Sequence, residues 1–507
     1  MGLIFKTKFL IVLTVLILLT GCYSFIGRYG DPFYEGQDQH HFERLIDDSL
    51  KPNNLGSDFT YRLAQDQDLR VVDAEQDYLN TCVNLKLILR FGWLSDVQIR
   101  QQEVKLFNDK VSLNLDNIIP SFEHDPVQED FDWAVYLSVI AAINQYHEKV
   151  SPIDFMIHTG DGIDAGTIEE LYAFIYITDR LRIPWLDLVG NHDASIFGNY
   201  KERLGYTRQA GVNFYPVGNM TNFLTMHGKE RWISGFGSHL LPVPSLGGHS
   251  PTEDGNRKIK GSLSHGFDLK VNNGQDSTGT NKFDPGTAKG YYALDIDNTT
   301  IPIRIIALNS VKLNSWGADG EIDTAQRNWL KQLIQSANGR LLLIFSHHRP
   351  QDFDSATMDV LFDAARGPMV FFSGHTHQHH LKPHQSNNGQ KFYELNTGSI
   401  LEYPQVGRLV EIRGEPGGHI CLTSRTFWNN YFDLETEIPR GELESYLKSC
   451  KENRNQHQKQ LDKAVRCGHY GAYKDFLDNR IKAWGRPQPI EEALSAANVV
   501  IPITLNR

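Results

Sequence analysis

Residues 155–164 read Phe-Met-Ile-His-Thr-Gly-Asp-Gly-Ile-Asp. Phe155–Ile157 is an apolar run of the length of a strand, and the glycines on both sides of Asp161 indicate a tight turn directly after it. Such a turn presents the Asp161 carboxylate without a bulky neighbour to cover it. The carboxyl ends of strands are where α/β sheets place their ligand sites. The stretch therefore predicts a sheet strand that carries a functional carboxylate at its end.

Similar apolar runs recur between Leu85 and about residue 426, separated by turns and helical stretches. They are Leu85–Trp93, Trp185–Val189, Ile303–Leu308, Leu341–Phe345, Met369–Phe372, Phe392–Leu395 and Leu409–Ile412. One helix is legible from Asp323 onward, because Trp329, Leu330 and Leu333 fall on one of its faces. Runs of strand length that alternate with helices predict an α/β fold whose sheet is covered on both faces.

Side chains that bind metals follow five of these runs. Two divalent ions about 3.5–4 Å apart need a carboxylate that bridges them and separate ligands on either side. Mixed oxygen and nitrogen donors suit Zn, Mn, Fe or Ni, and the absence of thiolates argues against a structural zinc site. The five blocks are Asp96 with Gln98, Asp161 with Asp164, Asn191 with His192 and Asp193, His347 with His348, and His375 with His377.

The order of these blocks resembles the motif set of the calcineurin-like metallophosphoesterases. That set reads Asp-x-(His), Gly-Asp-x-x-Asp, Gly-Asn-His-Asp, a strand-end His, and Gly-His-x-His, and here it spans Asp96 to His377. The resemblance implies a two-sheet β sandwich flanked by helices, with an α/β chain topology. It also implies hydrolysis of a small phosphoester by two divalent ions, Mn, Fe or Zn, with a bridging hydroxide that attacks phosphorus.

The resemblance also implies a role for each site residue. Asp96 would bind the first metal, Asp161 would bridge both, and Asn191 would bind the second through its carbonyl oxygen. Histidines would complete the two ligand shells, with His377 on the first metal; they are His347, His375 and His377.

One histidine of the set is expected not to bind metal. His192 resembles the residue that protonates the leaving group or steadies the transition-state oxygens, a role that suits imidazole at neutral pH. Asp193 would orient His192 as a partner outside the metal shell. Asp164 is open between a ligand and a turn or helix-cap residue.

Gln98 departs from the family pattern, in which most members carry a histidine ligand at this position. A glutamine oxygen can bind a metal, but more weakly and as a hard donor, so the identity of the first metal is open. His347 is favoured over His348 because it lies nearer to the end of its strand. The alternative function is a catalytically silent, lipid-anchored binding module on the same fold.

The N-terminus has the pattern of an export signal. Lys6 and Lys8 precede the apolar run Phe9–Leu19, which is shorter than the roughly 20 residues of a membrane-spanning helix. The run Leu-Thr-Gly-Cys at residues 19–22 resembles the lipobox of bacterial lipoproteins, which implies that Cys22 is acylated and anchors the exported chain to a membrane. Tyr23 after this cysteine favours the outer membrane or cell surface.

Four further cysteines permit two disulfides with three possible connectivities, or four reduced and buried thiols. They are Cys82, Cys421, Cys450 and Cys467, and sequence proximity favours the Cys450–Cys467 pair.

Composition divides the chain into segments. We expect a signal peptide at 1–21, a tether with short elements at 22–82, the metallophosphoesterase domain at 83–430 and a C-terminal helical appendage at 431–507. Residues 246–290 are rich in Gly, Ser and Asn and are expected to form a long surface loop. The formal net charge of −11 leaves no basic excess for nucleic acid, so none is expected as a partner.

Overall fold

The computed structural model describes residues 61–100, 103–106, 111–114, 126–164, 291–296, 301–312, 318–415, 418–429, 438–478 and 490–504, with residue 299 and most of 170–193. Within these ranges no helix is long and apolar enough to cross a membrane. The expected signal peptide, Cys22 and the loop at 246–290 lie outside the described residues.

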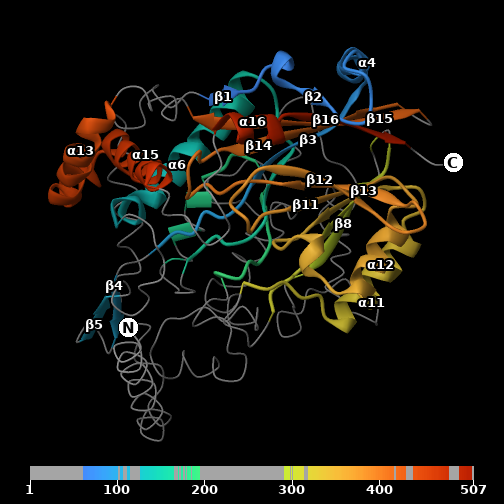
Figure 1. Cartoon of the computed structure of the whole chain (residues 1–507), viewed down its shortest axis with the longest axis horizontal. Helices are drawn as coiled ribbons and strands as arrows, with labels where there is room; N and C mark the ends of the chain where they lie inside the picture. Colours follow the sequence, from blue (N-terminus) through green and yellow to red (C-terminus); the bar gives the residue numbers. More distant parts are fainter. Residues whose placement is uncertain are drawn as a thin grey trace, which may run out of the picture.

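The larger sheet has eight strands and mixed direction (Figure 1). Its parallel part, β3–β6–β7, contains the strand that precedes Asp161. The order across the sheet is β2 (Arg70–Val71), β16 (Val499–Thr504), β15 (His419–Asn429), β14 (Gly407–Gly414), β3 (Leu87–Leu94), β6 (Phe155–His158) and β7 (Trp185–Asp187), with β1 (Tyr61–Leu63) paired to β15.

The second sheet has six strands, of which β9, β10, β11 and β13 run parallel. The order is β12 (His380–Gln385), β13 (Lys391–Asn396), β11 (Met369–Ser373), β10 (Leu341–Phe345), β9 (Ile303–Ala307) and β8 (Tyr292–Ile296). A separate pair is formed by β4 (Glu103–Leu106) and β5 (Val111–Asn114).

The two sheets pack face to face around a buried aromatic core. Phe345 and Phe372 of the smaller sheet stack with ring centroids 4.4 Å apart, and both meet the edge of Phe91 from the larger sheet at 5.8 Å. Trp93 adds an edge contact to Phe372 at 5.1 Å. Such aromatic pairs bury large apolar areas and fix the relative position of the sheets that supply them.

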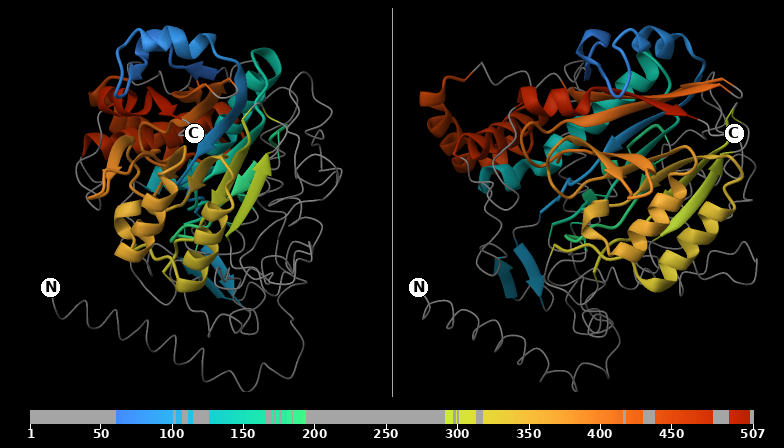
Figure 2. Two further views of the ribbon diagram at one scale, coloured as in Figure 1. Left: turned by 90° about the vertical axis from the view of Figure 1, so that its right-hand side faces the viewer. Right: turned by 45° about the vertical axis from the view of Figure 1, so that its right-hand side comes forward.

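Helices cover the outer face of each sheet (Figures 1 and 2). The larger sheet is covered by α6 (Pro126–Lys149) and α15 (Leu461–Leu477), and the smaller by α11 (Thr324–Gln335) and α12 (Ser355–Ala364). The helix expected from Asp323 onward is α11, and Asp323 caps it by accepting from the Gln326 amide at 2.7 Å. The prediction of a two-sheet sandwich flanked by helices is confirmed.

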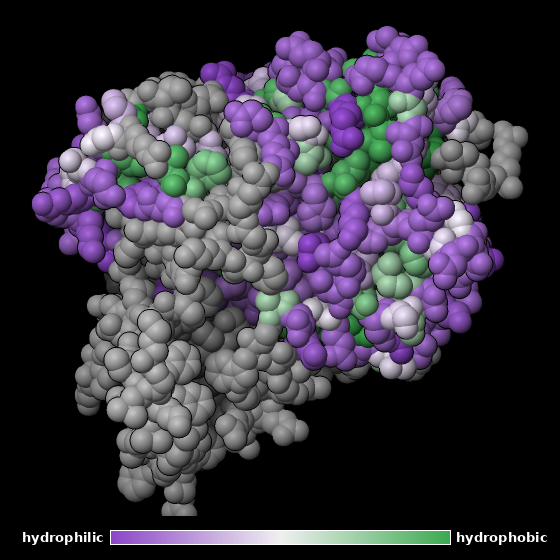
Figure 3. Space-filling view, viewed as in Figure 1, coloured by the Kyte–Doolittle hydropathy of each residue, from purple (hydrophilic) through white to green (hydrophobic). Residues whose placement is uncertain are grey.

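The remaining described helices lie mainly around the larger sheet. Figure 3 shows the face of the molecule that is turned to the viewer in Figure 1. The described residues on this face are mostly hydrophilic, with an apolar area near the larger sheet. These helices are α4 (Tyr78–Asn84), α13 (Arg440–Glu452), α14 (Arg454–His457), α16 (Ile490–Ala497), η1 (Asp66–Asp68) and η3 (Pro350–Asp352).

The C-terminal segment differs from the expected helical appendage. Four described helices, α13 to α16, follow Pro439, but the segment then returns as β16, which lies between β15 and β2 in the larger sheet. Val499, Val500 and Ile501 are fully buried there, because strands inside a covered sheet are apolar on both faces. This apolar run was not among the strands predicted from the sequence.

Two disulfides link elements of the described structure. Cys450–Cys467 joins α13 to α15, which confirms the favoured pair, and Cys82–Cys421 joins α4 to β15. The second bond ties the segment before residue 83 to the sandwich, as do the pairings of β1 and β2.

Candidate metal centre

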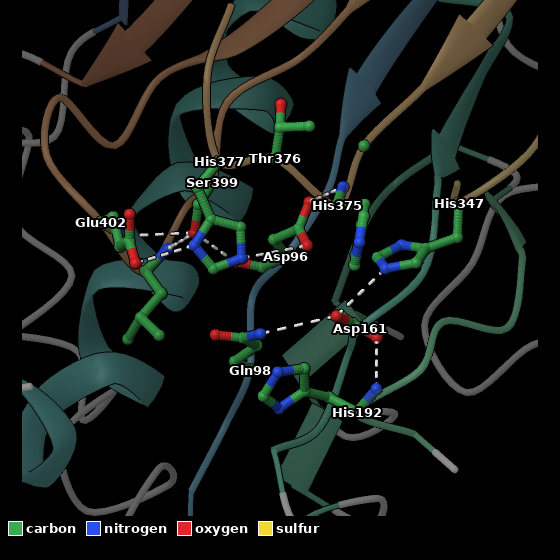
Figure 4. A network of polar contacts seen from close by, with 12 residues as sticks. Asp96, Gln98, Asp161, His192, His347, His375, Thr376, His377, Ser399 and Glu402 are labelled. Carbon is green, nitrogen blue, oxygen red and sulfur yellow. Dashed lines mark hydrogen bonds and ion pairs between the residues drawn. The ribbon is translucent and has the colours of Figure 1, made fainter. Parts of the chain in front are cut away.

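The site lies where parallel strands of both sheets end. Asp96 follows β3, Asp161 follows β6, and Asn191 follows β7, all in the larger sheet. His347 follows β10, and His375 follows β11, in the smaller sheet. The packing of the two sheets brings these strand-end loops together, so the five sequence blocks meet in one place (Figure 4).

The backbone of the site is unusual at the residues that carry the ligands. Asp96, Gln98, Asp161, His375 and His377 have φ angles of 53°, 46°, 58°, 71° and 55°. Residues other than glycine rarely adopt this left-handed backbone conformation. Where they do, the surrounding structure enforces the conformation, and such residues are frequent at functional sites. The inclusion of Gln98 marks it as part of the site despite its departure from the family pattern.

The second ligand group is built on Asp161, Asn191 and His347. His347 Nε2 lies 3.1 Å from Asp161 Oδ2 and 2.9 Å from Asn191 Oδ1. Its other nitrogen, Nδ1, lies 2.9 Å from the Thr159 carbonyl, which leaves Nε2 facing the two oxygen donors. A backbone carbonyl in this position fixes the tautomer in which Nε2 is free to bind metal.

The first ligand group is built on Asp96 and His377. His377 Nε2 lies 3.2 Å from Asp96 Oδ1, while Asp96 Oδ2 accepts the His375 backbone amide at 3.0 Å. Gln98 lies on the Asp161 side of this group, with Nε2 3.5 Å from Asp161 Oδ2 (Figure 4). Asp161 is thus flanked by both groups, where a bridging ligand belongs.

His348 is buried beside the site but points to a different partner. Its Nδ1 lies 2.8 Å from Ser310 Oγ, and its ring centroid is 4.4 Å from that of His375. Burial and the charge of His347 lower the pKa of His348 to about 3, so its ring is neutral. The structure thus brings His347, and not His348, against Asp161 and Asn191.

The donors fit divalent metal ions. Asp96 and Asp161 are almost completely buried, and carboxylates that are excluded from water need compensating positive charge. Ligand atoms of Asp96, Asp161 and His347 lie within 4.8 Å of one another, as do those of His347, His348 and His375. Burial would raise the pKa of Asp161, but the neighbouring His347 and His192 outweigh burial and lower it, so the carboxylate is ionised.

His192 lies next to Asp161, and Asp164 binds the Nδ1 side of its ring. Its backbone amide donates to Asp161 Oδ1 at 2.7 Å, and its Nδ1 lies 2.8 Å from Asp164 Oδ1. The buried Arg100 donates to the other oxygen of Asp164 at 2.7 Å. The residue that orients His192 is therefore Asp164, which corrects the expected role of Asp193. The sequence left Asp164 open as a turn residue because its partner is 28 positions away.

Asp193 has a structural function in the same loops. Its carboxylate accepts the backbone amides of Asp161, Ile163 and Gly190 at 3.0, 3.1 and 2.7 Å. Burial and the nearby carboxylates of Asp161 and Asp187 raise the pKa of Asp193 to about 7. Glycine is needed at position 190, because a Cβ there would lie 2.0 Å from Asp161 Oδ1. Asp193 thus fixes the turn that presents Asp161.

The site contains a further carboxylate that was not predicted from the sequence. Glu402 follows β13, the parallel neighbour of β11, and its Oε1 lies 2.8 Å from His377 Nδ1. The position of Glu402 in the sequence could have indicated its role, because the loop after the predicted strand Phe392–Leu395 also starts at the carboxyl end of a parallel strand.

The fold and the site define a two-sheet α/β protein with metal-ligand loops at its strand ends. Residues 89–274 match the family model of the calcineurin-like phosphoesterases. A solved structure of PhoD is similar at a TM-score of 0.35 and 9% sequence identity, over 68% of this chain and 66% of that chain. No curated protein matches the sequence.

Proposed function

We propose that the protein is a metal-dependent phosphoester hydrolase that uses two divalent ions. The observation that carries the proposal is the position of Asp161 between two ligand groups, with Asp96 and His377 on one side and Asn191 and His347 on the other. Asp96, His377 and Gln98 would hold the first ion, and Asn191, His347 and His375 the second.

Bound metal ions would polarise the phosphoryl oxygens and supply a nucleophile at neutral pH. The chain supplies the proton at His192. Burial would lower the pKa of His192, but the charges of Asp161 and Asp164 outweigh burial and raise it to about 9. A protonated ring at this position would donate to the leaving oxygen. Arg100 and Asp164 keep this ring in place.

Hydrolysis of an aryl phosphate monoester and the matching diester tests the function. Purified protein should cleave at least one of them, lose activity when a chelator removes its metals, and regain it with Mn or Zn. A protein that binds metal yet cleaves neither ester nor any member of a wider phosphoester panel would be the silent binding module instead.

The net charge of −11 favours a small phosphoester over nucleic acid as the substrate. Bound metal ions would provide the local positive charge that a small phosphate needs.

Gln98 should make the two metal sites unequal. A neutral amide oxygen is a weaker donor than imidazole for Zn and Fe, whereas oxygen-rich shells suit Mn. We expect one ion to remain through purification and the other to be partly lost and restored by Mn. Gln98→His should raise the affinity of the first site for Zn, measured by titration of the metal-free protein beside the wild type. Equal affinities in both proteins would show that Gln98 is not a ligand.

We further propose that the chain is exported and anchored to the outer membrane or cell surface through a lipid on Cys22. The support is the order of charged, apolar and small residues at 6–22. Mass spectrometry of the mature N-terminus should find an acylated Cys22 and no residues 1–21. An unmodified chain that begins at Met1 in the membrane fraction would contradict the anchor.

A further inference from the structure

The loop that joins β13 to β14 is hydrogen-bonded to the loop that carries Asp96. Ser399 Oγ donates to the Asp96 carbonyl at 2.7 Å and accepts the backbone amides of Leu401 and Glu402 at 2.9 and 3.1 Å. The Leu401 amide also lies 3.2 Å from the Asp96 carbonyl. One hydroxyl therefore turns the chain at Glu402 and fixes that turn to the backbone of a metal ligand.

This turn points the Glu402 carboxylate at the His377 ring. Oε1 of Glu402 lies 2.8 Å from His377 Nδ1, and Asp96 Oδ1 lies 3.2 Å from Nε2 on the opposite side (Figure 4). Glu402 is 6% exposed and Asp96 fully buried, so both contacts form away from bulk water. The imidazole is held between two carboxylates, one of which belongs to the first metal site.

Helix α15 supports the same turn from its outer side. The Tyr403 ring packs against Tyr473 and Phe476, with centroids 5.3 and 4.7 Å apart. Gln405 Oε1 lies 2.8 Å from Nδ1 of the fully buried His469. Two side chains that follow Glu402, those of Tyr403 and Gln405, are therefore anchored to a helix, which limits the movement of the carboxylate relative to His377.

From this arrangement we infer that Glu402 is a positioning residue for the first metal site, acting through His377. The carboxylate holds the tautomer with the proton on Nδ1, leaves Nε2 free to bind, and makes the imidazole a stronger donor. The inference rests on the proposed function and adds to the site a positioning residue that lies outside the five sequence blocks. Loss of such a partner weakens metal binding or activity by about 10–100-fold.

The loop has contacts that do not depend on the Glu402 side chain. The Ile400 amide donates to the Ser95 carbonyl at 3.2 Å, and Ser399 holds the turn through backbone groups. Removal of the carboxylate should therefore leave the loop folded. This separates a role in positioning His377 from a general role in stability.

Titration of metal-free full-length protein with Mn and with Zn tests the inference. Glu402→Ala should weaken the first site by about 10–100-fold and leave the second site unchanged. Glu402→Gln keeps the size of the side chain and should fall between Ala and the wild type. If Glu402→Ala fails to fold, Glu402→Gln decides alone, and its first-site affinity must still drop relative to the second.

Glu411→Gln is the matched control, because Glu411 is a buried carboxylate of the same sandwich that pairs with Arg90 away from the site. It should leave both metal affinities unchanged. Equal affinities in Glu402→Ala and the wild type, or an equal loss at both sites, would overturn the positioning role while leaving the proposed function intact. A wild-type chain that binds no metal would overturn the proposed function and this inference with it.

Discussion

Asp161→Asn should abolish phosphoester hydrolysis while the protein remains folded. The carboxylate lies between both ligand groups, with His347 Nε2 3.1 Å from Oδ2 and the His192 amide 2.7 Å from Oδ1. The amide of asparagine has a single oxygen that can bind a metal ion and carries no charge, so it cannot bridge two cations as a carboxylate does. Loss of several kcal/mol of metal-dependent stabilisation corresponds to at least about 1,000-fold in rate.

The variant is best measured by turnover, bound metal per chain and thermal unfolding together. Asp154→Asn is a suitable control, because Asp154 is a buried aspartate whose Oδ2 accepts the Arg90 amide at 2.7 Å, away from the metal centre. That control should keep its metals and its rate. If Asp161→Asn retains both metals and most of the activity, the active site lies elsewhere.

His192→Ala should lower the rate by about 10²–10⁴-fold while the metals remain bound. The ring lies next to Asp161, with Nδ1 2.8 Å from Asp164 Oδ1, and we expect Nε2 to donate the proton to the leaving group. A substrate whose leaving group needs no proton, such as a nitrophenyl ester, should suffer a smaller loss than an alkyl ester.

Asp164→Asn tests how His192 is held. This substitution removes the charge beside the His192 ring but keeps the shape of the side chain, so the rate should fall less than in His192→Ala. As in His192→Ala, the loss should be larger for an alkyl ester than for a nitrophenyl ester. Metal loss from His192→Ala would show that His192 is a ligand. An unchanged rate would remove it from the mechanism.

Much of the site was predictable because it depends on local patterns. Phe155–Ile157 followed by a Gly-Asp turn, and Leu341–Phe345 followed by His347, each combine a strand with the residues that leave it. Asp161 and His347 then meet because the parallel strands of two packed sheets end together. Sequence order is sufficient to place such residues.

The missed features depend on contacts between distant segments. Glu402 meets His377 through a turn fixed by Ser399, and no local pattern distinguishes it from any other loop glutamate. The partner of His192 was assigned to its neighbour Asp193, whereas the fold brings Asp164 to the ring.

The long helix α6 was missed for a different reason. Between residues 130 and 143 almost every side chain is buried, because β-strands lie on one side of the helix and α15 lies on the other. A helix that is apolar on all sides lacks the one-sided pattern by which amphipathic helices are recognised.

Anomalous diffraction from crystals grown with Mn tests the two-metal claim most directly. The account predicts two peaks about 3.5–4 Å apart, with Asp161 between them, one beside Asp96 and His377 and the other beside Asn191 and His347. Because of Gln98, the peak beside Asp96 should have the lower occupancy when Mn is limiting. A single peak at saturating Mn, or peaks away from Asp161, would contradict the account.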